Sequence, residues 1–183
     1  MRPGGAGALG GARVRRPLCY RRAHSSALRK GTGTMALNRD FVGRTFPAAT
    51  PYEVSRVKIK EFAAAIGDQN PIYRDPEAAR AAGHPDVIAP PTFPIVFSLA
   101  GAGAALADPE LGLDFSMVVH GEQRFHYTRP VRAGDELLCV STISDIRSVG
   151  RNELLTVTSE VTTVAGEPVC TTYNTLIERG GAA

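Results

Sequence analysis

Residues 67–73 read Gly-Asp-Gln-Asn-Pro-Ile-Tyr, a run that separates a helical pattern from a turn. Before the run, apolar side chains recur at helical spacing from Val57 to Ile66, behind Ser55, which can cap a helix N-terminus. Gly67 favours the end of that helix, and the residue before a proline avoids the helical conformation. The run therefore predicts a helix that stops at Gly67 and passes into a polar turn.

Two further helices are predicted downstream of this turn. Asp75-Pro76 supplies a capping side chain and a proline suited to the first helical turn, which predicts a short helix over 77–82. Residues 93–107 contain no charged side chain and are apolar or small on every side. A helix that is apolar all round is buried all round, so we expect one long buried helix here, weakened by its glycines.

The last third of the chain has the composition of a β-sheet. Segments rich in Val, Thr, Ile and Leu alternate with turn residues, and they predict four strands in a meander at residues 117–127, 135–147, 152–165 and 168–178. A short strand is also expected near residues 52–54. Helices segregated from an antiparallel sheet make an α+β domain, and one sheet wrapped around one long buried helix is the hot-dog fold.

The first 34 residues differ from the rest in charge. They hold eight Arg or Lys and no acid, whereas the remaining 13 basic residues are set against 18 acidic ones. Residues 1–34 therefore read as a disordered basic tail, a transit peptide, or translated sequence upstream of a start at Met35. Residues 35–183 are expected to form one domain, whose acidic balance argues against nucleic-acid binding.

The three cysteines, Cys19, Cys139 and Cys170, show no metal-binding spacing. Their odd number does not suit a disulfide framework either, so a reducing, cytoplasmic setting is favoured. Every apolar stretch is broken before it reaches 18 residues, and we expect no membrane-spanning helix. We also expect no bound metal and no cofactor.

Four stretches of the sequence, residues 63–73, 88–93, 119–125 and 130–135, together resemble the MaoC-like (R)-specific hydratases and dehydratases. The pattern of that family is Gly-Asp-x-Asn-Pro, an aliphatic residue and then His. The resemblance is closest to the FAS1-like dehydratase N-terminal domains, which include the non-catalytic subunits of actinobacterial (3R)-hydroxyacyl-ACP dehydratases. It spans about residues 38–178, and it implies the hot-dog fold and an acyl-CoA or acyl-carrier-protein thioester that gains or loses water at C2–C3.

Dehydration of a 3-hydroxyacyl thioester requires a base, a group that handles the leaving water, and donors for the thioester oxyanion. Asp68 and Asn70 match the Asp and Asn of the family motif, while Tyr73 stands where the motif has its His. A phenol has an unperturbed pKa of about 10 and is a poor base at neutral pH. The resemblance therefore implies a subunit that mainly binds the acyl chain, while a MaoC-like partner supplies the catalytic His.

The candidate site residues also have simpler interpretations. The motif is a good helix stop and turn, phenylalanines in a buried helix suit core packing, and a histidine in a strand suits a structural role. His120 and His126 are six residues apart, which would place both on one face of a strand. The catalytic candidates are Asp68, Asn70 and Tyr73 at the degenerate His position; the substrate-binding candidates are Pro91, Thr92, Phe93, Phe97 and His120, with backbone N–H groups near Thr92 and Phe93 as oxyanion donors.

Three functions remain open on the sequence alone. The first is a dehydratase or hydratase subunit of fatty-acid metabolism that is weak or inactive without its partner. The second is a non-enzymatic module that binds acyl-CoA or acyl carrier protein. The third, a hot-dog thioesterase, is disfavoured because residues 93–107 offer no acid or base. An exposed sheet edge predicts pairing with a catalytic MaoC-like chain or with a second copy.

Overall fold

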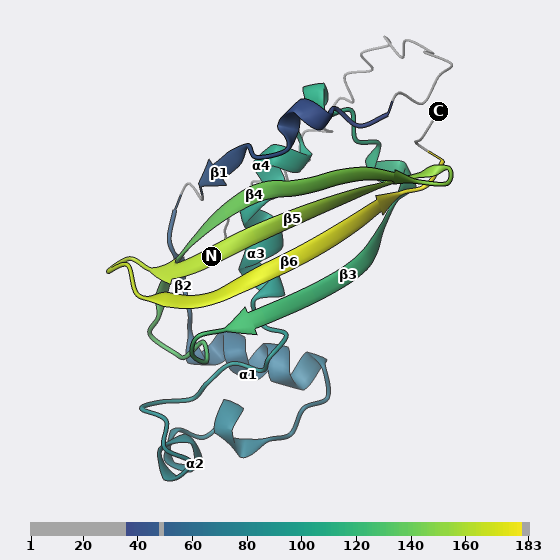
Figure 1. Cartoon of the computed structure of the whole chain (residues 1–183). Helices are drawn as coiled ribbons and strands as arrows, with labels where there is room; N and C mark the ends of the chain where they lie inside the picture. Colours follow the sequence, from purple (N-terminus) through teal and green to yellow (C-terminus); the bar gives the residue numbers. More distant parts are fainter. Residues whose placement is uncertain (1–35, 48–49, 181–183) are drawn as a thin grey trace, which may run out of the picture. The chain divides into compact units, whose positions relative to one another are not determined.

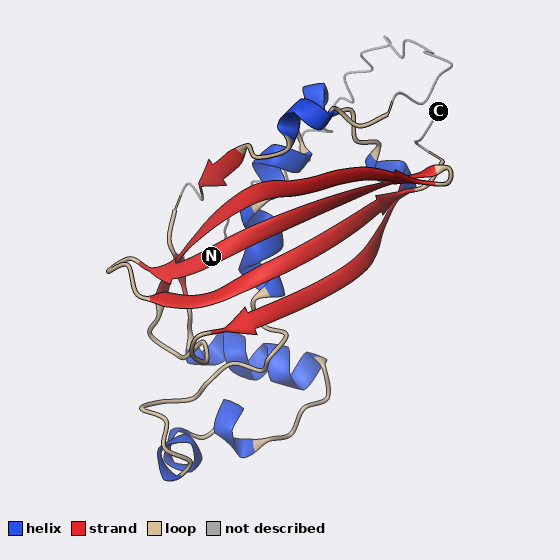
Figure 2. Cartoon of the chain, viewed as in Figure 1, coloured by secondary structure: helices blue, strands red, loops and turns tan. Residues whose placement is uncertain are grey.

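The computed structural model describes residues 36–47 and 50–180, so the interpretation of residues 1–34 lies outside it. Its sheet is antiparallel and has six strands, and short helices lie on one side of it and at one end (Figures 1 and 2). The strands are β1 (Thr45–Pro47), β2 (Tyr52–Glu53), β3 (Val118–Tyr127), β4 (Glu136–Val149), β5 (Asn152–Thr163) and β6 (Pro168–Glu178). The helices are α1 (Arg56–Ala65), α2 (Pro76–Ala81), α3 (Ile95–Gly101) and α4 (Gly103–Leu106), with 3-10 turns η1 (Arg39–Phe41), η2 (Pro71–Tyr73), η3 (Pro109–Leu111) and η4 (Phe115–Met117).

The order of the strands corrects the predicted meander. All four long strands are present near their predicted bounds, and β4, β5 and β6 do follow one another. However, β3 pairs with β6 rather than with β4, so the sheet order is β1-β4-β5-β6-β3, with β2 also paired to β4. The sheet therefore ends in β3, whose other edge makes no pairing among the strands that the structure describes.

The connection from β3 to β4 crosses the end of the sheet, which explains the unexpected order. The backbone N–H groups of Thr128 and Arg129 both donate to the carbonyl of Val169 at the start of β6, at 2.9 and 3.2 Å. The Arg129 side chain then donates to Asp135, just before β4, and to Glu167 in the β5–β6 turn. These contacts fix the β3–β4 connection across the end of the sheet. They join segments that are distant in the chain, so no local sequence pattern predicts them.

The first two helices form as the sequence predicts. Ser55 caps α1 by accepting a hydrogen bond from the N–H of Lys58 at 3.1 Å, and Gly67 follows the helix with a φ of +75° that favours glycine. Asp75 caps α2 through the N–H of Glu77 at 2.8 Å, with Pro76 in the first turn.

The long central helix is present in two pieces, α3 and α4, joined at Ala102, and it crosses one face of the sheet (Figure 1). A Cβ on Gly101 would lie 3.1 Å from the Sγ of Cys139, so the glycine permits a close approach to β4. The expectation of burial on every side is wrong for Leu99, which is 41% exposed. Only one side of the helix faces the sheet, so an apolar residue on the other side stays in solvent.

The core consists of two clusters, one at each end of the central helix. The first surrounds Phe93, which is fully buried and meets Tyr52, Phe62 and Phe97 at ring-centroid distances of 5.4–6.4 Å. The second joins α4 to η1 and to the far halves of β4, β5 and β6, around Phe41. Aromatic side chains contribute much of this burial because each removes a large apolar area from water.

A bulge in β3 overturns the prediction that His120 and His126 share a face. The register with β6 shifts between His120 and Glu122, so one extra residue is inserted at Gly121. His120 is paired with buried Leu176, whereas His126 is paired with Thr171 on the opposite face. The glycine inside a strand pattern is the sequence signal that could have revealed the bulge.

Cys139 and Cys170 are both buried and free, and no disulfide occurs within the described residues. Burial raises the pKa of both thiols, that of Cys170 to about 12. Within residues 36–47 and 50–180, no helix combines the length and the apolar character needed to cross a membrane.

Replacing Phe93 by Ala is expected to lower the free energy of unfolding by about 3–5 kcal/mol, because it leaves a cavity among aromatic rings. The control is Phe115→Ala, since Phe115 is 56% exposed and its loss should cost less than about 0.5 kcal/mol. Urea unfolding monitored by circular dichroism measures both. Equal losses in the two variants would contradict the assigned core.

Candidate functional site

The polar side chains of residues 67–73 mainly build the turn. The Oδ1 of Asp68 accepts a hydrogen bond from the N–H of Asn70 at 3.0 Å, and the Oδ1 of Asn70 accepts one from the N–H of Ile72 at 3.2 Å. These are two successive turns in which a side chain replaces a backbone acceptor. Asp68 is half-buried and Asn70 is exposed. The structural interpretation of the motif therefore holds, whatever else these residues do.

Arg74 closes the same turn. Its Nη2 donates to the carbonyl of Asp68 at 3.1 Å, and its half-buried side chain lies against the motif. The contact holds the two ends of the motif together. Asp68 therefore takes part in the turn through its carbonyl as well as its side chain.

Tyr73 is the motif side chain that enters the core, with 7% of its surface exposed. Burial raises the pKa of its phenol above the ordinary value, and the nearby charge of Asp68 raises it further. Both effects disfavour a tyrosinate, because each opposes a negative charge at this position. That Tyr73 is no base at neutral pH stays a prediction, which both effects favour.

A cavity of about 330 Å³ lies beside the motif. Tyr127 of β3 closes it on one side and donates from its hydroxyl to the carbonyl of Pro91 at 2.8 Å. Burial also raises the pKa of Tyr127, so both tyrosines remain neutral donors at physiological pH. The lining residues are Tyr73, Ile88, Ala89, Pro91, Tyr127, Thr128, Arg129 and Pro130.

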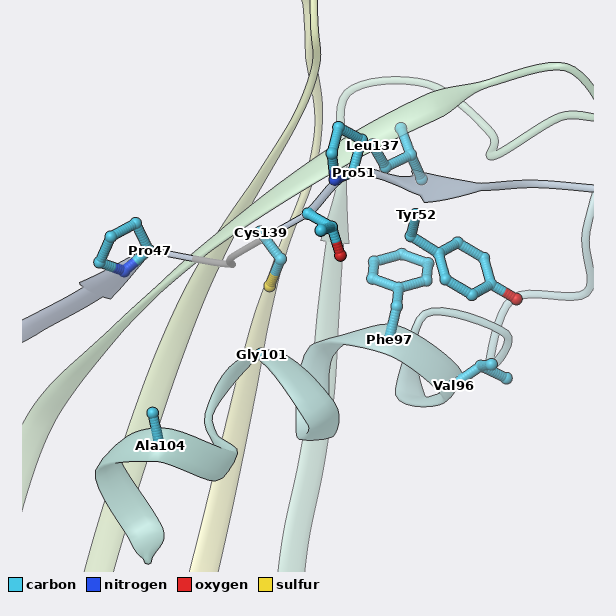
Figure 3. Close-up of a pocket in the computed structure, with 10 residues that line it drawn as sticks. Pro47, Pro51, Tyr52, Val96, Phe97, Gly101, Ala104, Leu137 and Cys139 are labelled. Atoms are coloured by element: carbon cyan, nitrogen blue, oxygen red, sulfur yellow. The ribbon is translucent and has the colours of Figure 1, made fainter. Parts of the chain in front are cut away.

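A second and larger cavity, of about 430 Å³, lies between the central helix, β2 and β4 (Figure 3). Phe97 and Tyr52 pack against one another at one side of it, with ring centroids 5.2 Å apart (Figure 3). Gly101 and Cys139 lie farther along the cavity. None of its lining residues is charged: they are Pro47, Thr50, Pro51, Tyr52, Val96, Phe97, Gly101, Ala104, Leu137 and Cys139.

The predicted site residues divide between these two cavities and the core. Tyr73 and Pro91 line the smaller cavity, and Phe97 lines the larger one. Phe93 is fully buried in the aromatic core instead. Its N–H donates to the carbonyl of Pro90 at 2.9 Å, so of the two expected oxyanion donors only Thr92, which is exposed, is left.

His120 lies away from the motif, on the inner face of β3, where its Nε2 lies 3.0 Å from the Oδ1 of Asn174. Tyr127 is a residue that the sequence interpretation did not assign to a cavity. The bulge at Gly121 decides which side chains of β3 face inward, so Tyr127 could have been found once that bulge was recognised. The described residues contain no group of three or more His, Cys, Asp or Glu that could hold a metal ion.

Comparison with known proteins places the chain in a family. Residues 40–172 match the model described as "FAS1-like, dehydratase domain region". The chain belongs to the FAS1-like dehydratase family. Among relatives of this dehydratase-like domain, the UPF0336 protein of Thermobifida fusca (strain YX) is 60% identical over 148 residues, which is 81% of this chain and 97% of the relative. The UPF0336 protein of Saccharopolyspora erythraea is 54% identical over 81% of this chain and 95% of the relative.

Solved structures share the hot-dog fold of this FAS1-like dehydratase domain. A MaoC-like dehydratase superposes with a TM-score of 0.71 and 32% identity over 76% of this chain, which spans only 42% of that longer protein. The HadBC (3R-hydroxyacyl-ACP dehydratase) complex from Mycobacterium tuberculosis gives a TM-score of 0.70 and 26% identity, over 77% of this chain and 99% of that one.

Arg129, which lines the smaller cavity, is held by two carboxylates. Its Nη1 lies 2.8 Å from Asp135 and its Nε lies 2.8 Å from Glu167. Asp135 also accepts from the N–H of Arg132 at 2.9 Å, and only 5% of its side chain is exposed, compared with 51% for Glu167. The buried carboxylate of Asp135 is therefore the main partner that holds Arg129 in the wall of the smaller cavity.

Asp135→Ala is expected to lower the free energy of unfolding by about 3 kcal/mol, because it leaves a largely buried guanidinium with a single exposed partner. Glu167→Ala removes the exposed partner and should cost much less, since water screens that ion pair. Thermal and urea unfolding of the two variants measure the difference. A larger loss of unfolding free energy in Glu167→Ala than in Asp135→Ala would contradict the assignment of Asp135 as the main partner of Arg129.

Proposed function

We propose that this chain is the acyl-binding subunit of a (3R)-3-hydroxyacyl-thioester dehydratase or enoyl hydratase, and that a partner subunit supplies the catalytic histidine. The observation that carries the proposal is Tyr73. It occupies the His position of the family motif, it is buried, and its surroundings raise its pKa. A base of neutral pKa is absent from the motif, although the motif turn itself is intact.

The larger cavity supports the acyl-binding part of the proposal. Its walls are uncharged and mostly apolar, as burial of an alkyl chain requires. The aromatic side chains of Tyr52 and Phe97 and the small residues Gly101 and Ala104 line this space beside the central helix (Figure 3). In this proposal the tail of the acyl group occupies that space, while the thioester lies towards the smaller cavity beside Tyr73.

The edge of β3 that pairs with no described strand supports the proposal of a partner subunit. This ten-residue strand ends the sheet, and an unpaired edge is a template for another strand. Phe115 and Met117 of η4, just before the strand, and Val119 at its beginning are 37–56% exposed. A related solved structure is a complex, the HadBC dehydratase, which favours a related chain as the occupant of this edge over a second copy.

A purely binding role is the second candidate, and one contact favours it. The Oδ1 of Asp68 already accepts from the N–H of Asn70, so this carboxylate has a structural use. Asp68→Asn separates the two candidates in the assembled complex. Retention of full hydratase activity supports a binding module, and a loss without a change in assembly supports a contribution of Asp68 to the reaction.

Hydration of a trans-2-enoyl thioester is expected only from the complex with a partner that carries Gly-Asp-x-Asn-Pro-x-His, with the lone chain at background. Replacing that His by Ala in the partner should lower kcat by about 10²–10⁴-fold, the usual contribution of a general base. Tyr73→Phe should leave kcat of the complex within about threefold, because it removes a hydroxyl and no base. Robust turnover by the lone chain would refute the subunit proposal.

Ala104→Phe should narrow the larger cavity and raise KM for long-chain enoyl thioesters about tenfold or more, while short-chain substrates are turned over normally. The control is Ala107→Phe, an exposed position just after α4 that does not line the cavity. Steady-state kinetics of the complex with a series of chain lengths measures both, and thermal melts confirm that the variants fold. An equal effect on all chain lengths would place the acyl tail elsewhere.

A further inference from the structure

Two buried glutamates stand opposite one another at the end of the sheet where β4 turns into β5. Glu153 of β5 and Glu178 of β6 are direct register partners, so their side chains lie on the same face. Glu153 is fully buried and Glu178 is 1% exposed. Acidic side chains are almost never buried to this extent unless they are paired with a cation or neutralised.

The hydrogen bonds at this pair satisfy only half of its oxygens. Ser148 donates from its hydroxyl to the Oε1 of Glu153, and the N–H of Asp114 donates to the Oε1 of Glu178 at 3.2 Å. The Oε2 atom of each glutamate is buried and has no hydrogen-bond partner in the described part of the chain. Each of these two register partners therefore has a buried acceptor without a donor, which a proton on one of the carboxyl groups could supply.

Among the described residues, no cationic side chain forms an ion pair with either glutamate. From η1, Arg39 donates to the hydroxyl of Ser148 at 2.9 Å and so reaches Glu153 only through that serine. From η4 comes Asp114, which is itself acidic. Leu155 and Leu176, two residues along the same strands, are buried in the apolar cluster around Phe41. Two carboxylates in such a setting cannot both be ionised at low cost.

We propose that Glu178, buried opposite Glu153, holds a proton at neutral pH, and that this proton makes the stability of this end of the sheet depend on pH. The pair then acts as one hydrogen-bonded unit, with the protonated carboxyl donating to the ionised one. Loss of the proton places two negative charges under η1 and η4, which both bond to the pair or to Ser148. Alkaline pH should therefore loosen these two turns first.

The electrostatics agree in direction with this geometry. Burial raises the pKa of Glu178, and the charges of Asp114 and Glu153 raise it further, against a lowering by the N–H of Asp114. A carboxyl whose folded pKa exceeds its unfolded value stabilises the fold fully below the unfolded pKa of about 4.3. That contribution is lost as the pH rises through the folded pKa, so the sensitive range lies above pH 4.3.

The experiment compares the thermal unfolding of the whole chain with that of Glu178→Gln at pH 5 and pH 8.5. Glutamine keeps the shape and donates a hydrogen bond without a charge, so at pH 8.5 the variant should melt roughly 2–4 °C higher than the native chain. At pH 5 the two should melt nearly together. Glu160→Gln, at an exposed position of the neighbouring strand β5, is the control and should show no such dependence on pH.

Two results would overturn the proposal. A Glu178→Gln variant that melts lower at both pH values would show that the ionised carboxylate is needed. Stabilisation of the native chain by CaCl₂ or MgCl₂ at pH 8.5, absent in the variant, would assign the pair to a cation instead of a proton. If Glu178→Gln does not fold, Glu153→Gln repeats the test, and the infrared band of a protonated buried carboxyl in the native chain at pH 7 decides it directly.

Discussion

The approach of the central helix to β4 sets the position of nearly everything else in this domain. Gly101 brings no side chain to the contact, and a Cβ there would lie 3.1 Å from Cys139 and 3.4 Å from Ser141. With the helix this close to the sheet, Phe93 and Phe97 reach the rings of Tyr52 and Phe62 at one end of it. The larger cavity is the space that remains beside this contact, since Gly101 and Cys139 both line it.

The motif at residues 67–73 shows how a family signature can persist while its chemistry changes. The side-chain oxygens of Asp68 and Asn70 accept hydrogen bonds from backbone N–H groups within the turn. The side chain of Arg74 donates to the carbonyl of Asp68. The turn held by these contacts leads into Tyr73, which is buried in the core. Here burial and the charge of Asp68 raise the pKa of the phenol, which disfavours a tyrosinate at the position where the family motif has its base.

The two ends of the sheet handle buried charge in different ways. At the β5–β6 end, Arg129 balances Asp135 and Glu167, and the resulting ion pairs hold the crossing from β3 to β4. At the β4–β5 end, Glu153 and Glu178 face one another with no cation in direct contact among the described residues. The ion pairs of Arg129 support the wall of the smaller cavity. For Glu153 and Glu178, a bound proton is the simplest way to reduce the negative charge of the pair.

The sequence by itself determined the helices capped by Ser55 and Asp75, the four long strands and the hot-dog class, because caps, turns and alternation are local properties of the chain. It also determined that residue 73 is not a histidine. Only the tertiary structure decided that β3 pairs with β6, that Gly121 turns His120 and His126 to opposite faces, and that Tyr127 meets the motif. Those features depend on contacts between residues far apart in the chain, and the pairing of Glu153 with Glu178 is of the same kind.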